Sequence, residues 1–135
     1  MIESCRACGA PNQVACGKLG EHARCGTCMR SLLPLVHPHA IHSKEELEEL
    51  VSESPLPVVI DFWSPANDAS RSVECDLERL ARAGGTVVAK VNTDEVPDAA
   101  ASFGVEEVPT LIRFRSGVEE ARSAGATARD LIRAV

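Results

Sequence analysis

The chain of 135 residues is poor in aromatic side chains, with no tyrosine, one tryptophan and three phenylalanines. It also lacks any apolar run near the roughly 20 residues that a membrane-spanning helix needs. Lysine and arginine number 14 against 20 aspartates and glutamates. Because nucleic-acid surfaces need clustered basic side chains, these shortages argue against nucleic acid or a membrane as partner. The first residues lack the basic and apolar regions of a secretory signal, which predicts a cytoplasmic protein.

Cysteine is missing from most of the chain, because five of the six cysteines fall within the first 28 residues and Cys75 stands alone. All four histidines precede residue 43. Residues 1–42 carry four basic and two acidic residues, whereas residues 43–135 carry ten basic and eighteen acidic residues. This asymmetry predicts two modules that are stabilised by different means.

Two Cys-x-x-Cys pairs, Cys5 with Cys8 and Cys25 with Cys28, are separated by sixteen residues. This spacing is typical of a structural zinc site, because each pair makes a turn that directs two sulfurs at one point. Four thiolates complete a tetrahedral site for one Zn²⁺ ion and leave no position open for catalysis. Two disulfides are the alternative, which suits a cytoplasmic chain poorly. Cys16 is expected to lie outside the site, with ligand exchange as the alternative.

The segment SLLPLVHPHAIH, residues 31–42, contains two prolines and three of the histidines. It is interpreted as a linker whose histidines, His37, His39 and His42, are solvated; a second metal site is the alternative. The predicted organisation is therefore a zinc ribbon over 1–33, a linker over 34–42 and an α/β domain over 43–135.

Helices and strands are predicted to alternate after residue 42. Helices are expected to begin after Ser43, near Asn67 or Asp68, at Asp98 and after Thr127. Strands are expected at 58–60, 86–91, 110–115 and 118–124, with a hairpin turn at 116–117. Helices that alternate with strands and end in a hairpin predict a sheet of mixed direction in an α/β fold.

The segments VVIDFWSP (58–65), KVNTDE (90–95), FGVEEVPTLIRFRSG (103–117) and GA (125–126) resemble the thioredoxin family in order and spacing. With the four-cysteine ribbon in front, the chain is similar to the zinc-containing thioredoxins of the thioredoxin 2 type. The resemblance implies a thioredoxin fold, a mixed central sheet flanked by helices, with a cis peptide before Pro109. It also implies a groove at this cis-proline loop that takes a protein or an extended peptide. The implied groove residues are Trp63, Ala66, Val108, Pro109 and Thr110.

Residues 66–70 read ANDAS where the resemblance places the family's active site, W-C-G-P-C. Asn67 occupies the place of the attacking cysteine, and Ser70 occupies the place of the resolving cysteine. Thiol–disulfide exchange needs a thiolate that attacks and a second thiol that resolves the mixed disulfide, and neither residue supplies one. We therefore expect a protein-binding or scaffold module that has lost dithiol–disulfide oxidoreductase activity.

Asp61 and Lys90 match accessory positions of the family, an aspartate that assists proton transfer and a lysine near it. Without a cysteine to serve, Asp61 is expected to be a buried carboxylate held by Lys90 or water, with its pKa raised by desolvation. Two other functions remain open. One is an atypical oxidoreductase that uses Cys75 or a ribbon cysteine, although Cys75 is expected to be a partly buried bystander. The other is a redox sensor whose zinc–thiolate cluster releases its metal on oxidation.

Overall fold

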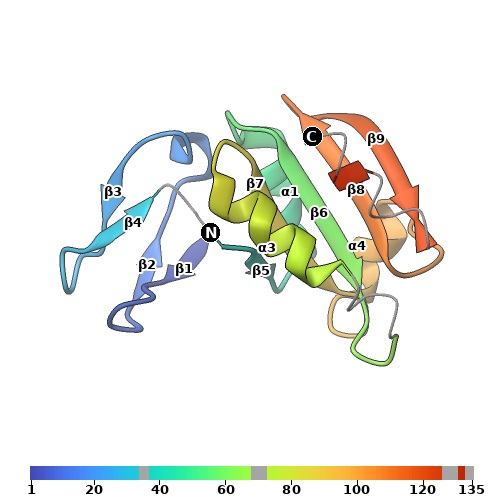
Figure 1. Cartoon of the computed structure of the whole chain (residues 1–135), viewed down its shortest axis with the longest axis horizontal. Coiled ribbons are helices and arrows are strands. Elements are labelled where there is room, and N and C mark those ends of the chain that lie inside the picture. The colour runs from blue at the N-terminus through green and yellow to red at the C-terminus, as the bar shows by residue number, and fades with distance from the viewer. Residues whose placement is uncertain (34–36, 68–72, 126–130, 133–135) are drawn as a thin grey trace.

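The computed structural model describes residues 1–33, 37–67, 73–125 and 131–132. Two small β-hairpins at the amino terminus lie beside a larger twisted sheet (Figure 1). Helix α3 covers one face of that sheet, and α1 and α4 cover the other (Figure 1). No helix within these ranges has the length and apolar character to cross a bilayer.

The amino-terminal ribbon, residues 1–33, consists of two antiparallel hairpins joined by a short 3₁₀ helix, η1 (Cys16–Lys18). In the first hairpin β1 (Ile2–Ser4) pairs with β2 (Pro11–Gln13), and in the second β3 (Ala23–Arg24) pairs with β4 (Ser31–Leu33). Each turn holds one cysteine pair. The residue after each pair, Gly9 or Met29, has a φ of 77° or 66°, so both turns reverse through a left-handed residue.

The large sheet has five strands in the order β5-β7-β6-β8-β9. The central strand β6 (Val58–Trp63) runs parallel to β7 (Val87–Asn92) and antiparallel to β8 (Thr110–Arg115). The edge strands are β5 (His39–Ile41), parallel to β7, and β9 (Val118–Ala124), antiparallel to β8. The sheet of mixed direction confirms the predicted fold class.

The helices begin and end where local residue chemistry favours it. Helix α1 (Lys44–Glu53) follows Ser43, whose hydroxyl accepts the Glu46 N–H at 3.1 Å, as the capping pattern predicts. Helix α3 (Glu74–Ala83) ends at Gly84, whose φ is 77°, and α4 (Pro97–Ser102) is followed by Gly104. The predicted start of the second helix at Asn67 or Asp68 is tested only up to Asn67, which is not helical. Residues 68–72 and the predicted cap at Thr127 lie outside the described residues.

Alternate residues of β6 face two apolar cores, because side chains of a strand point to opposite faces in turn. Ile60 and Phe62 pack in the core below α1 and α4, and Val59 packs in the core below α3. The first core continues into the ribbon. The ribbon residues that belong to this core are Met1, Val14, Cys16, Leu19 and Leu33. The ribbon therefore shares its apolar interior with the α/β domain.

Candidate functional site

The cis-proline loop lies between α4 and β8. The peptide bond between Val108 and Pro109 is cis, as the family resemblance implied. The Pro109 carbonyl accepts the Gly125 N–H at 2.8 Å, and the Thr110 hydroxyl donates to the Glu107 carbonyl at 2.6 Å. Pro109 and Thr110 are buried and Val108 is half-buried, so Val108 is the member of this triplet that solvent reaches.

Asn67 reaches this loop from the end of β6. Its backbone N–H donates to the Ser64 carbonyl at 3.1 Å, and its side-chain Nδ2 donates to the Val108 carbonyl at 3.1 Å. The structure thus brings Asn67 to the residue that precedes the cis proline. A carboxamide has no nucleophilic thiol to offer there. Ser70, the other predicted position, lies outside the described residues.

Two further predicted groove residues lie on the same connection. Ala66 is exposed, and Trp63 is half-buried with the Lys90 ammonium 4.8 Å from its ring centroid. A hollow of about 270 Å³ opens beside Val108. Three of its lining residues are acidic: Asp94, Glu106 and Glu107. The cis-proline loop is therefore flanked by a concave surface of negative charge.

Asp61 is fully buried in the middle of β6. Neither of its carboxylate oxygens has a hydrogen-bond partner among the described residues. Burial raises the pKa of Asp61 to about 7, while the charge of Lys90 opposes this rise and that of Glu74 adds to it. The predicted rise in pKa is confirmed. The prediction named Lys90 or water as the group that holds Asp61. The Lys90 alternative is wrong, because its ammonium lies 3.7 Å from Glu74 and over Trp63, and water stays the prediction.

The four ribbon cysteines meet at one point, where their sulfurs all lie within 4.8 Å of one another. The Cys5 and Cys28 sulfurs are 3.6 Å apart, and the Cys8 and Cys25 sulfurs are 3.7 Å apart. A tetrahedral ion with Zn–S bonds near 2.3 Å places its sulfurs about 3.8 Å apart. The spacing of the four thiols therefore fits a single tetrahedral metal ion.

Hydrogen bonds in the two turns favour the thiolate form that a metal needs at Cys5 and Cys25. Cys8 differs, because the hydrogen bond from the Ala10 N–H, which lowers its pKa, is outweighed by burial and by the neighbouring sulfurs of Cys28, Cys25 and Cys5, which raise the pKa to about 11. The backbone N–H groups of Cys8 and Ala7 lower the pKa of Cys5. The Cys28 backbone N–H, with the Asn12 amide and the Thr27 N–H, lowers the pKa of Cys25 to about 6. The structure places Cys16 outside this cluster, as expected, with its sulfur buried near Glu49 and Glu53. None of the six cysteines forms a disulfide.

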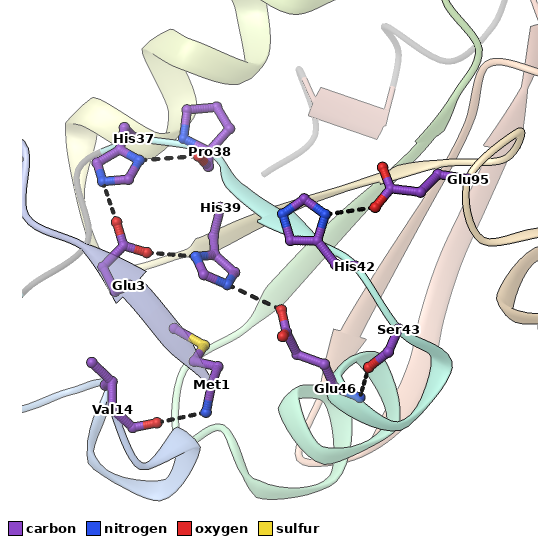
Figure 2. A network of polar contacts seen from close by, with 10 residues as sticks. All are labelled: Met1, Glu3, Val14, His37, Pro38, His39, His42, Ser43, Glu46 and Glu95. Carbon is purple, nitrogen blue, oxygen red and sulfur yellow. Dashed lines mark hydrogen bonds and ion pairs between the residues drawn. The ribbon is translucent and has the colours of Figure 1, made fainter. Parts of the chain in front are cut away.

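A buried ionic network joins the ribbon to the α/β domain (Figure 2). The Glu3 carboxylate on β1 lies 2.7 Å from His37 Nε2 and also contacts His39 Nδ1. His39 Nε2 lies 3.3 Å from the Glu46 carboxylate on α1. Burial alone would raise the pKa of Glu3, but hydrogen bonds from His37 and His39 lower it to about 2. The network therefore places a charged carboxylate between the two modules.

The expectation that the linker histidines are solvated is wrong for two of the three. His39 is 5% exposed and His37 is half-buried, while His42 is exposed beside Glu95. The cause is pairing of residues 39–41 with β7, which carries His39 under the ribbon. Sequence reasoning missed Glu3. The signal was its position two residues from both Met1 and Cys5, which are buried, because every second residue of a strand faces the same side.

Cys75 is exposed on α3, which corrects the expectation that it is partly buried. Val73, Leu77 and Ala81 take the buried face of this helix, so Cys75 is left on the solvent side. Its neighbours in the chain, Glu74 and Asp76, are acidic.

A model of the protein family described as Thioredoxin matches residues 38–135. Thioredoxin C-3 of Corynebacterium nephridii is 35% identical over 127 residues, covering 93% of this chain and 86% of that protein. Thioredoxin 1 of Chlorobaculum tepidum is 40% identical over 84 residues, covering 61% of this chain and 83% of that protein.

Solved structures with a similar fold include two thioredoxins. The structure from Trypanosoma brucei brucei has a TM-score of 0.69 at 23% identity, and covers 77% of this chain and 92% of its own. The structure from Fasciola hepatica has a TM-score of 0.65 at 28% identity, and covers 71% of this chain and 94% of its own. In both cases the overlap spans most of the comparison protein.

Proposed function

Because the chain belongs to the thioredoxin family, we propose that it keeps the family's fold as a module that binds a protein or an extended peptide. In this proposal residues 66–70 carry no disulfide reductase activity. The observation that carries it is the hydrogen bond that the Asn67 side chain donates to the carbonyl of Val108, the residue before the cis proline. A carboxamide at this place supports binding through hydrogen bonds and offers no thiolate for exchange.

The proposed binding face combines the half-exposed Val108 with the exposed Ala66 and the acidic hollow beside them. In this proposal an extended chain would pair with the backbone at Val108, two residues before β8 begins. Asp94, Glu106 and Glu107 would attract lysine or arginine side chains of that chain. We therefore propose a partner segment that is extended and basic.

One structural Zn²⁺ ion completes the proposal. Cys5, Cys8, Cys25 and Cys28 would hold it, and the sulfur spacing and the turn hydrogen bonds support this assignment. When bound, the ion cross-links the two hairpins of the ribbon. Because the ribbon shares a core with the α/β domain, the ion would stabilise the whole chain. Six unpaired cysteines agree with the reducing conditions of the expected cytoplasmic location.

Insulin reduction in the presence of dithiothreitol tests the loss of reductase activity. We expect precipitation of insulin at the rate of the reaction without protein. A faster rate would overturn the proposal. Binding is tested separately by capture of partners from the native cell with and without a reducing agent, because recovery that survives the reducing agent indicates non-covalent binding.

Charge reversal tests the acidic hollow. Glu106 is exposed and lines this hollow, so Glu106→Lys should weaken capture of the partner. Glu48→Lys on the exposed face of α1 is the matched control and should leave capture unchanged. Equal recovery with both variants would place the binding face elsewhere.

A second function is favoured by one observation, the exposure of Cys75. A single accessible thiol can attack a disulfide of a partner, which forms a mixed disulfide and releases the other cysteine of that partner disulfide as a thiol; an external thiol then resolves the mixed disulfide. Cys75→Ser distinguishes the two functions. If partner capture depends on Cys75 and disappears under reducing conditions, the covalent function replaces the binding function.

A further inference from the structure

Three arginine side chains of this acidic chain have no ionic or hydrogen-bonding partner among the residues that the structure describes. The guanidinium groups of Arg6, Arg30 and Arg82 make no ion pair or hydrogen bond within the described part of the chain. Of the other described basic residues, Arg24 donates to a backbone carbonyl and the rest form ion pairs. Those with ion pairs are Lys18, Lys44, Arg79, Lys90, Arg113, Arg115 and Arg122.

These three arginines line two hollows where the ribbon meets α3. One hollow of about 360 Å³ is lined by Arg6 and Arg30 with His22 and His37. A second hollow of about 310 Å³ is lined by Arg82 and again by Arg6 and His37. Because the two hollows share Arg6 and His37, they adjoin. We call this surface the basic groove, defined by Arg6, His22, Arg30, His37 and Arg82.

The charge of the basic groove is not balanced by the acidic residues that line it. Two carboxylates of the described residues line it, those of Glu3 and Glu78. Glu3 is buried and already contacts His37 and His39, so its charge is compensated inside the protein. Glu78 thus stands against three arginines, in a chain whose net charge is −6.

Unpaired guanidinium groups that share a concave surface suit an anion with several oxygens. A guanidinium binds phosphate through two parallel hydrogen bonds, and its charge does not depend on pH in the physiological range. The exposed hydroxyl residues Ser4 and Ser31 also line the first hollow and can donate to the same oxygens. Each hollow reaches the lower end of the volume range of small-molecule sites.

We propose that the basic groove binds a small molecule that carries phosphate groups. Arg6 contacts it from the centre of the groove, with Arg30 on the ribbon side and Arg82 on the α3 side. This inference goes beyond the proposed function, because it uses neither Asn67 nor the cis-proline loop. Its ligand can be a nucleotide or another phosphate ester, since the recognised group is the phosphate.

The test is a titration of the zinc-loaded full chain with adenosine, AMP and ADP at about 150 mM salt, a concentration that screens weak surface attraction. We expect no binding of adenosine and saturable binding of the nucleotides, with ADP tighter than AMP. Inorganic phosphate and ribose 5-phosphate are the competing arms, which distinguish recognition of phosphate from recognition of the base. Zinc content is measured afterwards, so that loss of the metal to ADP is not mistaken for binding.

Two variants locate the site. Arg6→Ala and Arg82→Ala should each weaken ADP binding about tenfold or more, as expected for loss of a charged hydrogen-bond donor. Arg82 lies on α3, away from the cysteine turns, so its variant remains informative if Arg6→Ala perturbs the ribbon. Arg115→Ala, in an exposed pair with Glu120, is the matched control and should bind ADP like the wild type.

The proposal is overturned if ADP shows no saturable binding, or if adenosine binds as well as ADP. It also fails if both variants bind ADP like the wild type. One such outcome has a definite meaning: if Arg6→Ala lowers zinc affinity and neither variant changes ADP binding, the arginines balance the charge of the metal–thiolate cluster instead.

Discussion

The buried carboxyl of Asp61 should make the stability of the protein fall as pH rises, and Asp61→Asn should remove this dependence. Asp61 is fully buried, and neither carboxylate oxygen has a partner within the described residues. The pKa of the group rises from its ordinary value of 3.8 to about 7 on folding. Between these two values the folded state holds a proton that the unfolded state releases, so stability decreases as pH increases.

The magnitude follows from the same two values. Each pH unit between them costs about 1.4 kcal/mol, so the whole window corresponds to about 4 kcal/mol. Stability is highest below the ordinary value, and its decrease levels off once the folded group is ionised. From pH 5 to pH 8 the wild type should lose about 2–3 kcal/mol relative to Asp61→Asn.

Urea denaturation of the two proteins at matched pH values measures this difference directly. Subtracting one free energy of unfolding from the other removes every titration that they share, including those of the cysteine cluster. The buried amide of asparagine lacks partners as well, so the comparison uses the slope with pH and not the absolute difference. A difference that stays constant from pH 5 to pH 8 would show that Asp61 titrates at its ordinary value, and the account of its burial would be wrong.

Three further predictions concern the ribbon and its contact with the domain. Removal of zinc by a chelator should lower the melting temperature of the whole chain in one transition, because the ribbon shares its core with the domain. An unchanged melting temperature of the α/β domain, residues 43–135, followed by the circular dichroism of its helices, would contradict this. Glu3→Gln should lower the free energy of unfolding, measured in urea, by about 1–3 kcal/mol, since two histidines lose a charged acceptor. The exposed control Glu48→Gln should change it by no more than about 0.5 kcal/mol, and equal losses would show that the network does not stabilise the protein. Ser43→Ala should lower the free energy of unfolding by about 1 kcal/mol, because the Glu46 N–H loses the hydroxyl that caps it, and an unchanged value in the same assay would contradict this.

The features that the sequence predicts correctly depend on neighbouring residues. Ser43 begins α1 and Gly84 ends α3, because each acts on backbone groups within one helical turn. The turn at Ser116 and Gly117 has φ values of 52° and 80°, as a two-residue hairpin turn requires. The cis peptide before Pro109 came from the family resemblance, which carries information that no local rule contains.

The features that the sequence does not predict depend on contacts between distant residues. Glu3 and His39 are 36 positions apart, and their contact arises only when β5 joins β7 below the ribbon. Lys90 turns toward Glu74 on α3 because that carboxylate is within reach, and Asp61 has no hydrogen-bond partner in the part of the chain that the structure describes. Such contacts depend on how the helix and the sheet pack, so the periodicity of the sequence does not predict them. The unpaired arginines of the basic groove belong to the same class, since Arg6 and Arg82 meet through the docking of the ribbon.

The most direct test of the central claim compares insulin reduction by the wild type with that of the double variant Asn67→Cys, Ser70→Cys. In our proposal the fold remains competent, and residues 66–70 lack the two thiols that exchange requires. It predicts background activity for the wild type and turnover above background for the double variant, in side-by-side assays with dithiothreitol. Turnover by the wild type that equals that of the double variant would contradict the claim.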